Sequence, residues 1–143
     1  MIVAVVLAGL AVLVAVVVQR RQRPDAPVRT GYSVPDQLDR ADFARPEAPW
    51  LVAVFTSATC STCAGVWDRA RPLESAEVAV QEIEYGADRA LHDRYRIEAV
   101  PVALVVDGDG TVAARFVGPV TATDLWAAVA EAREPGSTPD ACH

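Results

Sequence analysis

The chain has 143 residues, a formal net charge of −6 and three cysteines. This length accommodates one compact domain with appended segments and excludes a second enzyme domain. From Tyr32 to His143 there are nine arginines and eighteen carboxylates, and the resulting charge of −9 argues against nucleic acid as a partner. The cysteine number also argues against a small scaffold held together by disulfides, which uses a larger and even set.

An unbroken apolar run, Ile2–Val18, opens the chain. As a helix, its seventeen residues would span about 25 Å, which is near the short limit for crossing a bilayer. A signal peptide is disfavoured because no basic stretch precedes the run and Gln19-Arg20-Arg21 follows it. A buried core helix is disfavoured because the run has no polar stripe. We therefore expect a single-pass transmembrane anchor at residues 1–19, with residues 2–18 in the membrane.

The arginines after the apolar run predict on which side of the membrane the rest of the chain lies. These are Arg20, Arg21, Arg23 and Arg29, whereas only Met1 precedes the run. By the positive-inside rule, the following domain faces the cytoplasm. A few additional residues at the start would rebalance the charges, so an extracytoplasmic domain is the alternative.

A flexible tether is predicted at residues 20–31, because prolines and charged residues alternate there without apolar periodicity. The folded domain is expected at residues 32–133, followed by a disordered tail at 134–143. Within the domain, Asp36–Phe43 predicts a short helix-like segment with Leu38 and Phe43 as apolar contacts.

Apolar runs and turn residues then predict alternating strands and helices. Trp50–Phe55 is typical of a strand buried on both faces, and Cys60 to about Ser75 is typical of a helix that Pro72 kinks or ends. The next elements are a strand at Val78–Ile83 and a helix at Asp88–Arg96.

A hairpin and a last helix complete the domain. Two apolar strands, Val102–Val106 and Thr111–Val117, flank a tight turn with two glycines. Thr123-Asp124 is expected to cap the last helix, and Pro135-Gly136 to stop it. This order of elements predicts an α/β fold with a mixed parallel and antiparallel sheet.

The chemistry is expected at Cys60-Ser61-Thr62-Cys63, where a buried strand meets a helix. Free N–H groups and the dipole at the start of a helix stabilise a thiolate, which lowers the pKa of the first cysteine and favours attack on a disulfide. The spacing of two residues puts the second sulfur within bridging distance.

A metal site is the competing interpretation of this cysteine pair. Zinc needs two further ligands, and the chain offers only His92, in a predicted helix where it should be exposed or half-buried, and His143, beside Cys142 in the tail. Copper would favour a nearby methionine, but the one methionine is Met1. We therefore expect no metal and no cofactor other than the Cys60–Cys63 disulfide. Two tryptophans, Trp67 and Trp126, are expected in the core.

The sequence resembles the thioredoxin superfamily through three segments: Trp50–Cys63, Tyr95–Val106 and Gly110–Gly118. The resemblance covers most of Tyr32–Arg133 and implies a thioredoxin-like mixed sheet flanked by helices. It also implies that the proline at Pro101 is cis and that Val100 and Pro101 dock the substrate backbone. By the same resemblance, Cys60 is the nucleophile and Cys63 resolves the mixed disulfide.

The site departs from the usual thioredoxin pattern at several positions. Thr59 stands where a tryptophan is common, and Ser61-Thr62 replaces Gly-Pro between the cysteines. The hydroxyls of Ser61 and Thr62, between the cysteines, could donate hydrogen bonds to a thiolate and make the pair more oxidising. The buried acid six residues before the nucleophile is replaced by Val54, so deprotonation of Cys63 would rely on water or substrate.

Two main functional hypotheses follow. The first is a membrane-tethered thiol–disulfide oxidoreductase that exchanges disulfides with protein substrates and with a separate electron donor or acceptor. The second is a non-catalytic interaction module or redox sensor with the same fold, which the loss of the acid at Val54 favours. Metal delivery is a remote third.

Overall fold

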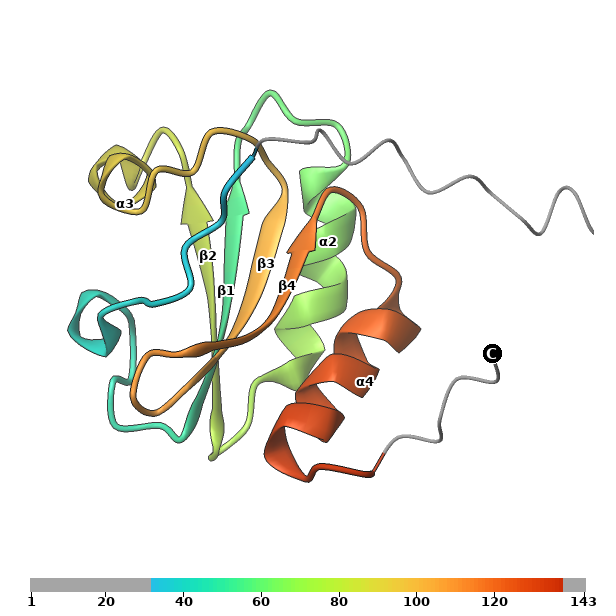
Figure 1. The fold of residues 1–143 in the computed structure, drawn as a ribbon. Helices are drawn as coiled ribbons and strands as arrows, with labels where there is room; N and C mark the ends of the chain where they lie inside the picture. Colours follow the sequence, from blue (N-terminus) through green and yellow to red (C-terminus); the bar gives the residue numbers. More distant parts are fainter. Residues whose placement is uncertain (1–31, 138–143) are drawn as a thin grey trace, which may run out of the picture. The chain divides into compact units, whose positions relative to one another are not determined.

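The computed structural model describes residues 32–137 (Figure 1). The expected membrane anchor, the whole of the expected tether and residues 138–143 of the expected tail lie outside these residues. Within residues 32–137, no helix is both long enough and apolar enough to cross a membrane.

A four-stranded sheet forms the centre of the domain. Its strands are β1 (Trp50–Thr56), β2 (Val78–Glu84), β3 (Val102–Asp107) and β4 (Val112–Val117), in the order β2-β1-β3-β4. β2 pairs parallel to β1, whereas β3 pairs antiparallel to both β1 and β4. The prediction of an α/β fold with a mixed sheet is thus confirmed for the described domain.

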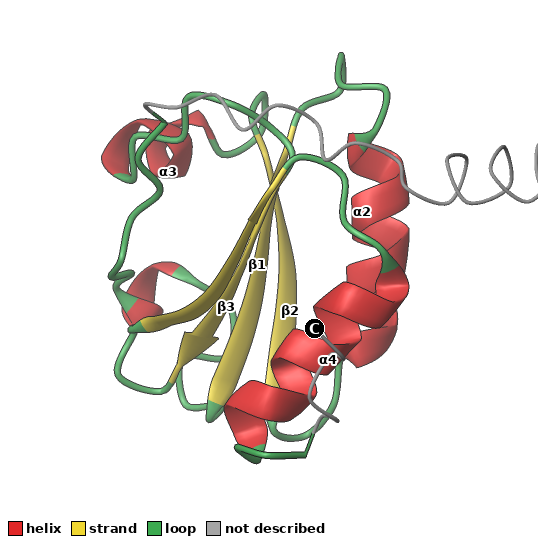
Figure 2. Cartoon of the chain, turned by 45° about the vertical axis from the view of Figure 1, so that its right-hand side comes forward, coloured by secondary structure: helices red, strands yellow, loops and turns green. Residues whose placement is uncertain are grey.

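Helices cover both faces of this sheet (Figures 1 and 2). One face carries α2 (Cys63–Ala70) and α4 (Ala122–Arg133), and the other carries α3 (Arg89–Arg94) and the short 3₁₀ helix η1 (Arg40–Asp42). Pro72 acts as predicted: α2 ends at Ala70, and the chain continues into a second 3₁₀ turn, η2 (Arg71–Leu73).

The core consists of two apolar layers, one on each face of the sheet. Alternate residues of β1 enter opposite layers: Leu51, Ala53 and Phe55 pack beneath η1 and α3, and Val52 and Val54 pack beneath α2 and α4. The expectation that this strand is buried on both faces is therefore confirmed. Leu38 and Phe43 are buried in the first layer, as expected.

Four local predictions were wrong. The helix α2 starts at Cys63 rather than at Cys60. Thr121, not Thr123-Asp124, caps α4, because its hydroxyl accepts the N–H of Asp124 at 3.1 Å. His92 is only 2% exposed. Trp126 is 46% exposed, because its indole N–H reaches the carbonyl of Arg69 at the surface between α4 and α2, at 2.8 Å.

Candidate active site

Cys60 and Cys63 are joined by a disulfide, with their Cα atoms 5.5 Å apart. Cys63 is the first residue of α2, and Cys60 lies in the turn that connects β1 to this helix. Because α2 begins after Cys60, this residue precedes the helix, at the end where backbone N–H groups have no partner within the helix. A negative charge on the Cys60 sulfur is stabilised at this end.

The two cysteines differ in exposure. Cys60 is half-buried, whereas only 3% of the surface of Cys63 is exposed. A protein substrate can therefore reach Cys60 but not Cys63 without rearrangement. This asymmetry matches an exposed attacking thiol and an enclosed second thiol.

Only one of the hydroxyls near the cysteines contacts a sulfur among the described residues. The Thr62 hydroxyl lies 3.7 Å from Sγ of Cys60, within range of a weak hydrogen bond to sulfur. The Thr59 hydroxyl instead pairs with that of Ser57 at 3.1 Å, and Ser61 is exposed on the turn. Thr62 is thus the hydroxyl placed to stabilise a Cys60 thiolate.

A carboxylate on β2 anchors the turn before the cysteines. Glu84 accepts the N–H of Ala58 at 3.0 Å and, through its other oxygen, the N–H of Ala87 at 3.0 Å. Hydrogen bonds from the N–H groups of Gly86 and Ala58 hold the pKa of Glu84 below its ordinary value. The role of Glu84 could not be recognised in the sequence, because its partner Ala58 is known only once β2 is placed beside β1.

Pro101 lies at the end of the sheet where β1 leads into this turn. The Val100–Pro101 peptide bond is cis, and Pro101 is followed at once by Val102, which pairs with Phe55 near the end of β1. The carbonyl of Pro101 accepts the N–H of Gly118 at 2.8 Å. Within residues 32–137, neither the N–H nor the carbonyl of Val100 has a backbone partner. An extended peptide could therefore pair with Val100.

Val54 is fully buried, as an apolar replacement for an acid should be. Its neighbour in the parallel register is Glu82 of β2, and the Thr56 hydroxyl donates to the Glu82 carboxylate at 2.8 Å. The sequence alone could have predicted the face on which this carboxylate lies. Val78, Val80 and Glu82 are spaced by two residues, so their side chains point to the same face of the strand.

The described residues contain no cluster of three or more histidine, cysteine or acidic side chains that could hold a metal. His92 contacts the carbonyl of Ile83 through Nε2 at 2.9 Å, and its ring meets those of Phe55 and Tyr85 edge-on. Its burial is thus explained by hydrogen bonding and packing.

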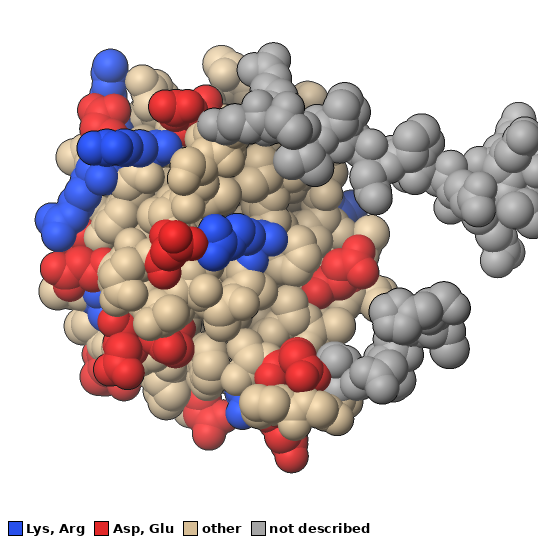
Figure 3. Space-filling view, in the orientation of Figure 1, with Lys and Arg blue, Asp and Glu red and all other residues tan. Residues whose placement is uncertain are grey.

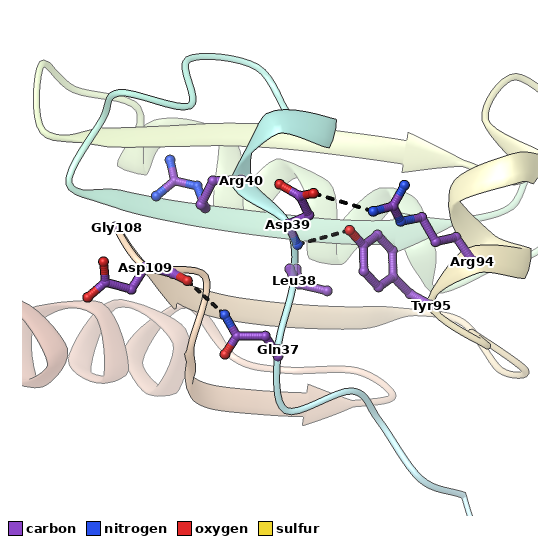
Figure 4. Close-up of a pocket in the computed structure, with 8 residues that line it drawn as sticks. All are labelled: Gln37, Leu38, Asp39, Arg40, Arg94, Tyr95, Gly108 and Asp109. Carbon is purple, nitrogen blue, oxygen red and sulfur yellow. Dashed lines mark hydrogen bonds and ion pairs between the residues drawn. The ribbon is translucent and has the colours of Figure 1, made fainter.

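A shallow pocket of about 450 Å³ lies away from the cysteines, between η1, the end of α3 and the β3–β4 turn (Figure 4). Its polar groups bind one another: Asp39 pairs with Arg94, and its N–H donates to the Tyr95 hydroxyl. The Arg40 guanidinium donates to the carbonyls of Asp107 and Arg45. These contacts tie η1 to the sheet and to α3.

Acidic and basic side chains are interspersed on the face seen in Figure 3. Several arginines of the described residues form ion pairs, such as Arg115 with Asp36 at 2.6 Å and Arg94 with Asp42 at 3.0 Å. The basic side chains form no continuous surface on the face seen in Figure 3.

The fold and the site together define a thioredoxin-like domain with a disulfide in a Cys-x-x-Cys motif. The domain is similar to a mutant thioredoxin from Halobacterium salinarum NRC-1, with 22% identity and a TM-score of 0.54 over 71% of this chain and 95% of that one. It is similar to a Fasciola hepatica thioredoxin, with 21% identity and a TM-score of 0.51 over 59% and 81% of the two chains. Oxidised mitochondrial thioredoxin 3 from Saccharomyces cerevisiae matches with 17% identity and a TM-score of 0.50, over 60% and 81%.

These similarities establish the thioredoxin fold. No protein-family model matches the sequence, and no curated protein matches it either.

Proposed function

We propose that the protein is a thiol–disulfide oxidoreductase that exchanges disulfides with protein substrates through Cys60 and Cys63. The observation that carries this proposal is the difference in exposure between the two linked cysteine residues, together with the unpaired backbone groups of Val100. Thioredoxin folds with this motif are suited to such exchange because the helix start favours a thiolate at the exposed sulfur.

In the reducing direction, the Cys60 thiolate attacks one sulfur of a substrate disulfide. The Cys60–substrate bond forms while the substrate disulfide breaks, and the leaving sulfur takes up a proton. The Cys63 thiolate then attacks Sγ of Cys60 and releases the second substrate thiol. Two electrons and two protons pass to the substrate, and the Cys60–Cys63 disulfide remains. The oxidising direction is the reverse of these steps.

Variants of the two cysteines test this assignment. Cys63→Ser should accumulate mixed disulfides with substrate proteins, because Cys60 still attacks but nothing resolves the adduct. Cys60→Ser should accumulate none, because Cys63 is enclosed. Non-reducing electrophoresis followed by reduction measures both; equal trapping by the two variants would refute the assignment of roles.

A non-catalytic redox sensor or interaction module is the second candidate, and the burial of an apolar residue at Val54 favours it. Reduction of insulin disulfides and reoxidation of a reduced protein separate the two candidates. A chain that turns over in neither direction, but still cycles slowly between dithiol and disulfide, is the sensor.

We further propose that residues 2–18 tether the domain to a membrane, with the domain on the cytoplasmic side. The apolar run and the four arginines that follow it support this arrangement. A reporter fused after His143 tests the orientation: a signal restricted to the outer side would favour the extracytoplasmic alternative.

A further inference from the structure

The proposed exchange requires that the Cys63 thiol lose its proton before it attacks Cys60. This thiol is enclosed. Val54 occupies the position where the buried acid is expected, and its fully buried side chain cannot accept a proton. Another group must therefore take the proton. The following inference rests on the proposed oxidoreductase function.

A carboxylate stands one strand away from the missing acid. The parallel register places Glu82 of β2 directly beside Val54 of β1. Both side chains lie on the face of the sheet covered by α2, because Val52 and Val54 of β1 and Val78 of β2 belong to the apolar layer on that face. Glu82 follows Val78 by four residues and so shares its face.

The Thr56 hydroxyl connects this carboxylate to the end of β1. Thr56 is fully buried, and its Oγ1 donates to Oε1 of Glu82 at 2.8 Å. It follows Val54 by two residues and therefore lies on the same face, at the end of the strand that leads into the cysteine turn. A hydroxyl that donates to a carboxylate can accept a second hydrogen bond through its lone pairs.

Cys63 lies above the same end of the sheet. Cys63, Val66 and Ala70 are the buried residues of α2, and the latter two pack in the layer that contains Val54. The helix runs back along β1, since it starts after the strand's last residue and covers its face. Its first turn is therefore nearest to Thr56, with the Cys63 side chain on the side that faces the sheet.

The geometry points to Glu82 as the acceptor of the Cys63 proton, with Thr56 as the relay between them. The Cys63 S–H proton passes to Oγ1 of Thr56 as the hydroxyl proton of Thr56 passes to the Glu82 carboxylate. The Cys63 thiolate then attacks Cys60, the Cys60–substrate bond breaks, and the proton on Glu82 returns to the released thiolate through solvent. Because Glu82 acts on Cys63 only through the Thr56 hydroxyl, we call it a positioning residue and not a catalytic residue.

Other charged groups near Glu82 do not take this role. Glu84 lies on the same strand, but both of its oxygens accept backbone N–H bonds, which lower its pKa and make it a poorer proton acceptor. The charged residues of α2 and η2 are Asp68, Arg69 and Arg71, and all three are exposed. The described residues of β1 carry no charge.

The test separates the two thiol steps in the reduced full-length protein with dithiobis(nitrobenzoate), an aromatic disulfide that releases a coloured thiolate. Attack by Cys60 releases the first equivalent, and attack by Cys63 on the resulting mixed disulfide releases the second. We expect Glu82→Gln to slow the second phase by about 10- to 100-fold while the first phase changes by less than about twofold.

Matched variants exclude a merely structural effect. Glu82→Asp and Thr56→Ser keep the carboxylate and the hydroxyl and should restore most of the second-phase rate, whereas Thr56→Val should slow it with Glu82 intact. Glu77→Gln removes a carboxylate beside the opposite end of β2 and should change neither phase. An unchanged second-phase rate in Glu82→Gln would overturn the inference. Absence of a second equivalent from the unmodified protein would instead refute the proposed function.

Discussion

Placing an acid at Val54, where thioredoxins are expected to carry one, should destabilise this protein in a pH-dependent manner. Val54 is fully buried, packs with Val66 beneath α2, and has Glu82 as its register neighbour. Val54→Ala is the reference variant. It removes two buried methyl groups, worth roughly 0.8 kcal/mol each, and leaves a small cavity, so we expect a loss of about 2–3 kcal/mol in unfolding free energy.

Val54→Asp adds the cost of a buried carboxyl group to this loss. A neutral carboxyl without full hydrogen bonding costs about 1–3 kcal/mol in proteins. Desolvation and the adjacent Glu82 disfavour its ionised form, so its pKa in the folded state rises above the unfolded value. If that rise is about three units, the variant loses a further ~4 kcal/mol at neutral pH.

The sign of the pH dependence follows from this raised pKa. Below the unfolded pKa the carboxyl is protonated in both states, and only the neutral cost remains. As the pH rises toward the folded pKa, the carboxyl ionises first in the unfolded state, which stabilises that state. The free energy of unfolding of Val54→Asp therefore falls. Urea unfolding followed by tryptophan fluorescence at pH 4 and pH 7 measures the gap between Val54→Asp and Val54→Ala. A gap that stays constant between the two pH values would refute the reasoning.

The remaining predictions concern the scaffold. Gly110→Ala should lower the unfolding free energy by about 3 kcal/mol or more, because φ is +86° and a Cβ would lie 1.9 Å from the Leu38 carbonyl oxygen. Gly118→Ala, at φ +93° with open space, should cost only about 1–2 kcal/mol. Urea unfolding measures both glycine variants. Tyr95→Phe should cost about 1 kcal/mol, because the hydroxyl donates to Asp42 and accepts the N–H of Asp39. Burial and the bond to Asp42 raise the pKa of Tyr95, so this contribution is present below the ordinary tyrosine pKa and is lost as the pH rises through the raised value. Denaturant titrations of both proteins should therefore converge at high pH; a constant difference would contradict this account.

The strands of this domain could be predicted from the sequence because each is a short apolar run bounded by turn residues. The β3–β4 hairpin is the clearest case, since Gly110 adopts the positive φ that its tight turn requires. The start of α2 was harder to predict, because Ser61 and Thr62 both favour a helix cap. Thr62 occupies that position without any side-chain capping bond, so the sequence contained no local signal for the choice.

The candidate site could be predicted only where its residues are close in sequence. The disulfide pair follows from its spacing, but the contact between Thr56 and Glu82 depends on parallel pairing across a separation of 26 residues. His92 shows the same limit: a polar residue in a six-residue helix becomes buried because a strand carbonyl nine residues earlier binds its ring. Single-sequence periodicity carries no information about such partners.

The position of Glu82 on the edge of the sheet resolves a conflict between stability and proton transfer. β1 is a central strand, covered on both faces, so an acid at Val54 would lose nearly all contact with water. β2 is the edge strand, and Glu82 remains partly exposed there. A carboxylate at this position keeps part of its hydration and can return a proton to solvent, while the Thr56 hydroxyl extends its reach beneath α2. The chain can thus retain the apolar Val54 at the centre of the sheet. Glu82 still serves as the proton acceptor for Cys63, because the Thr56 hydroxyl connects the two.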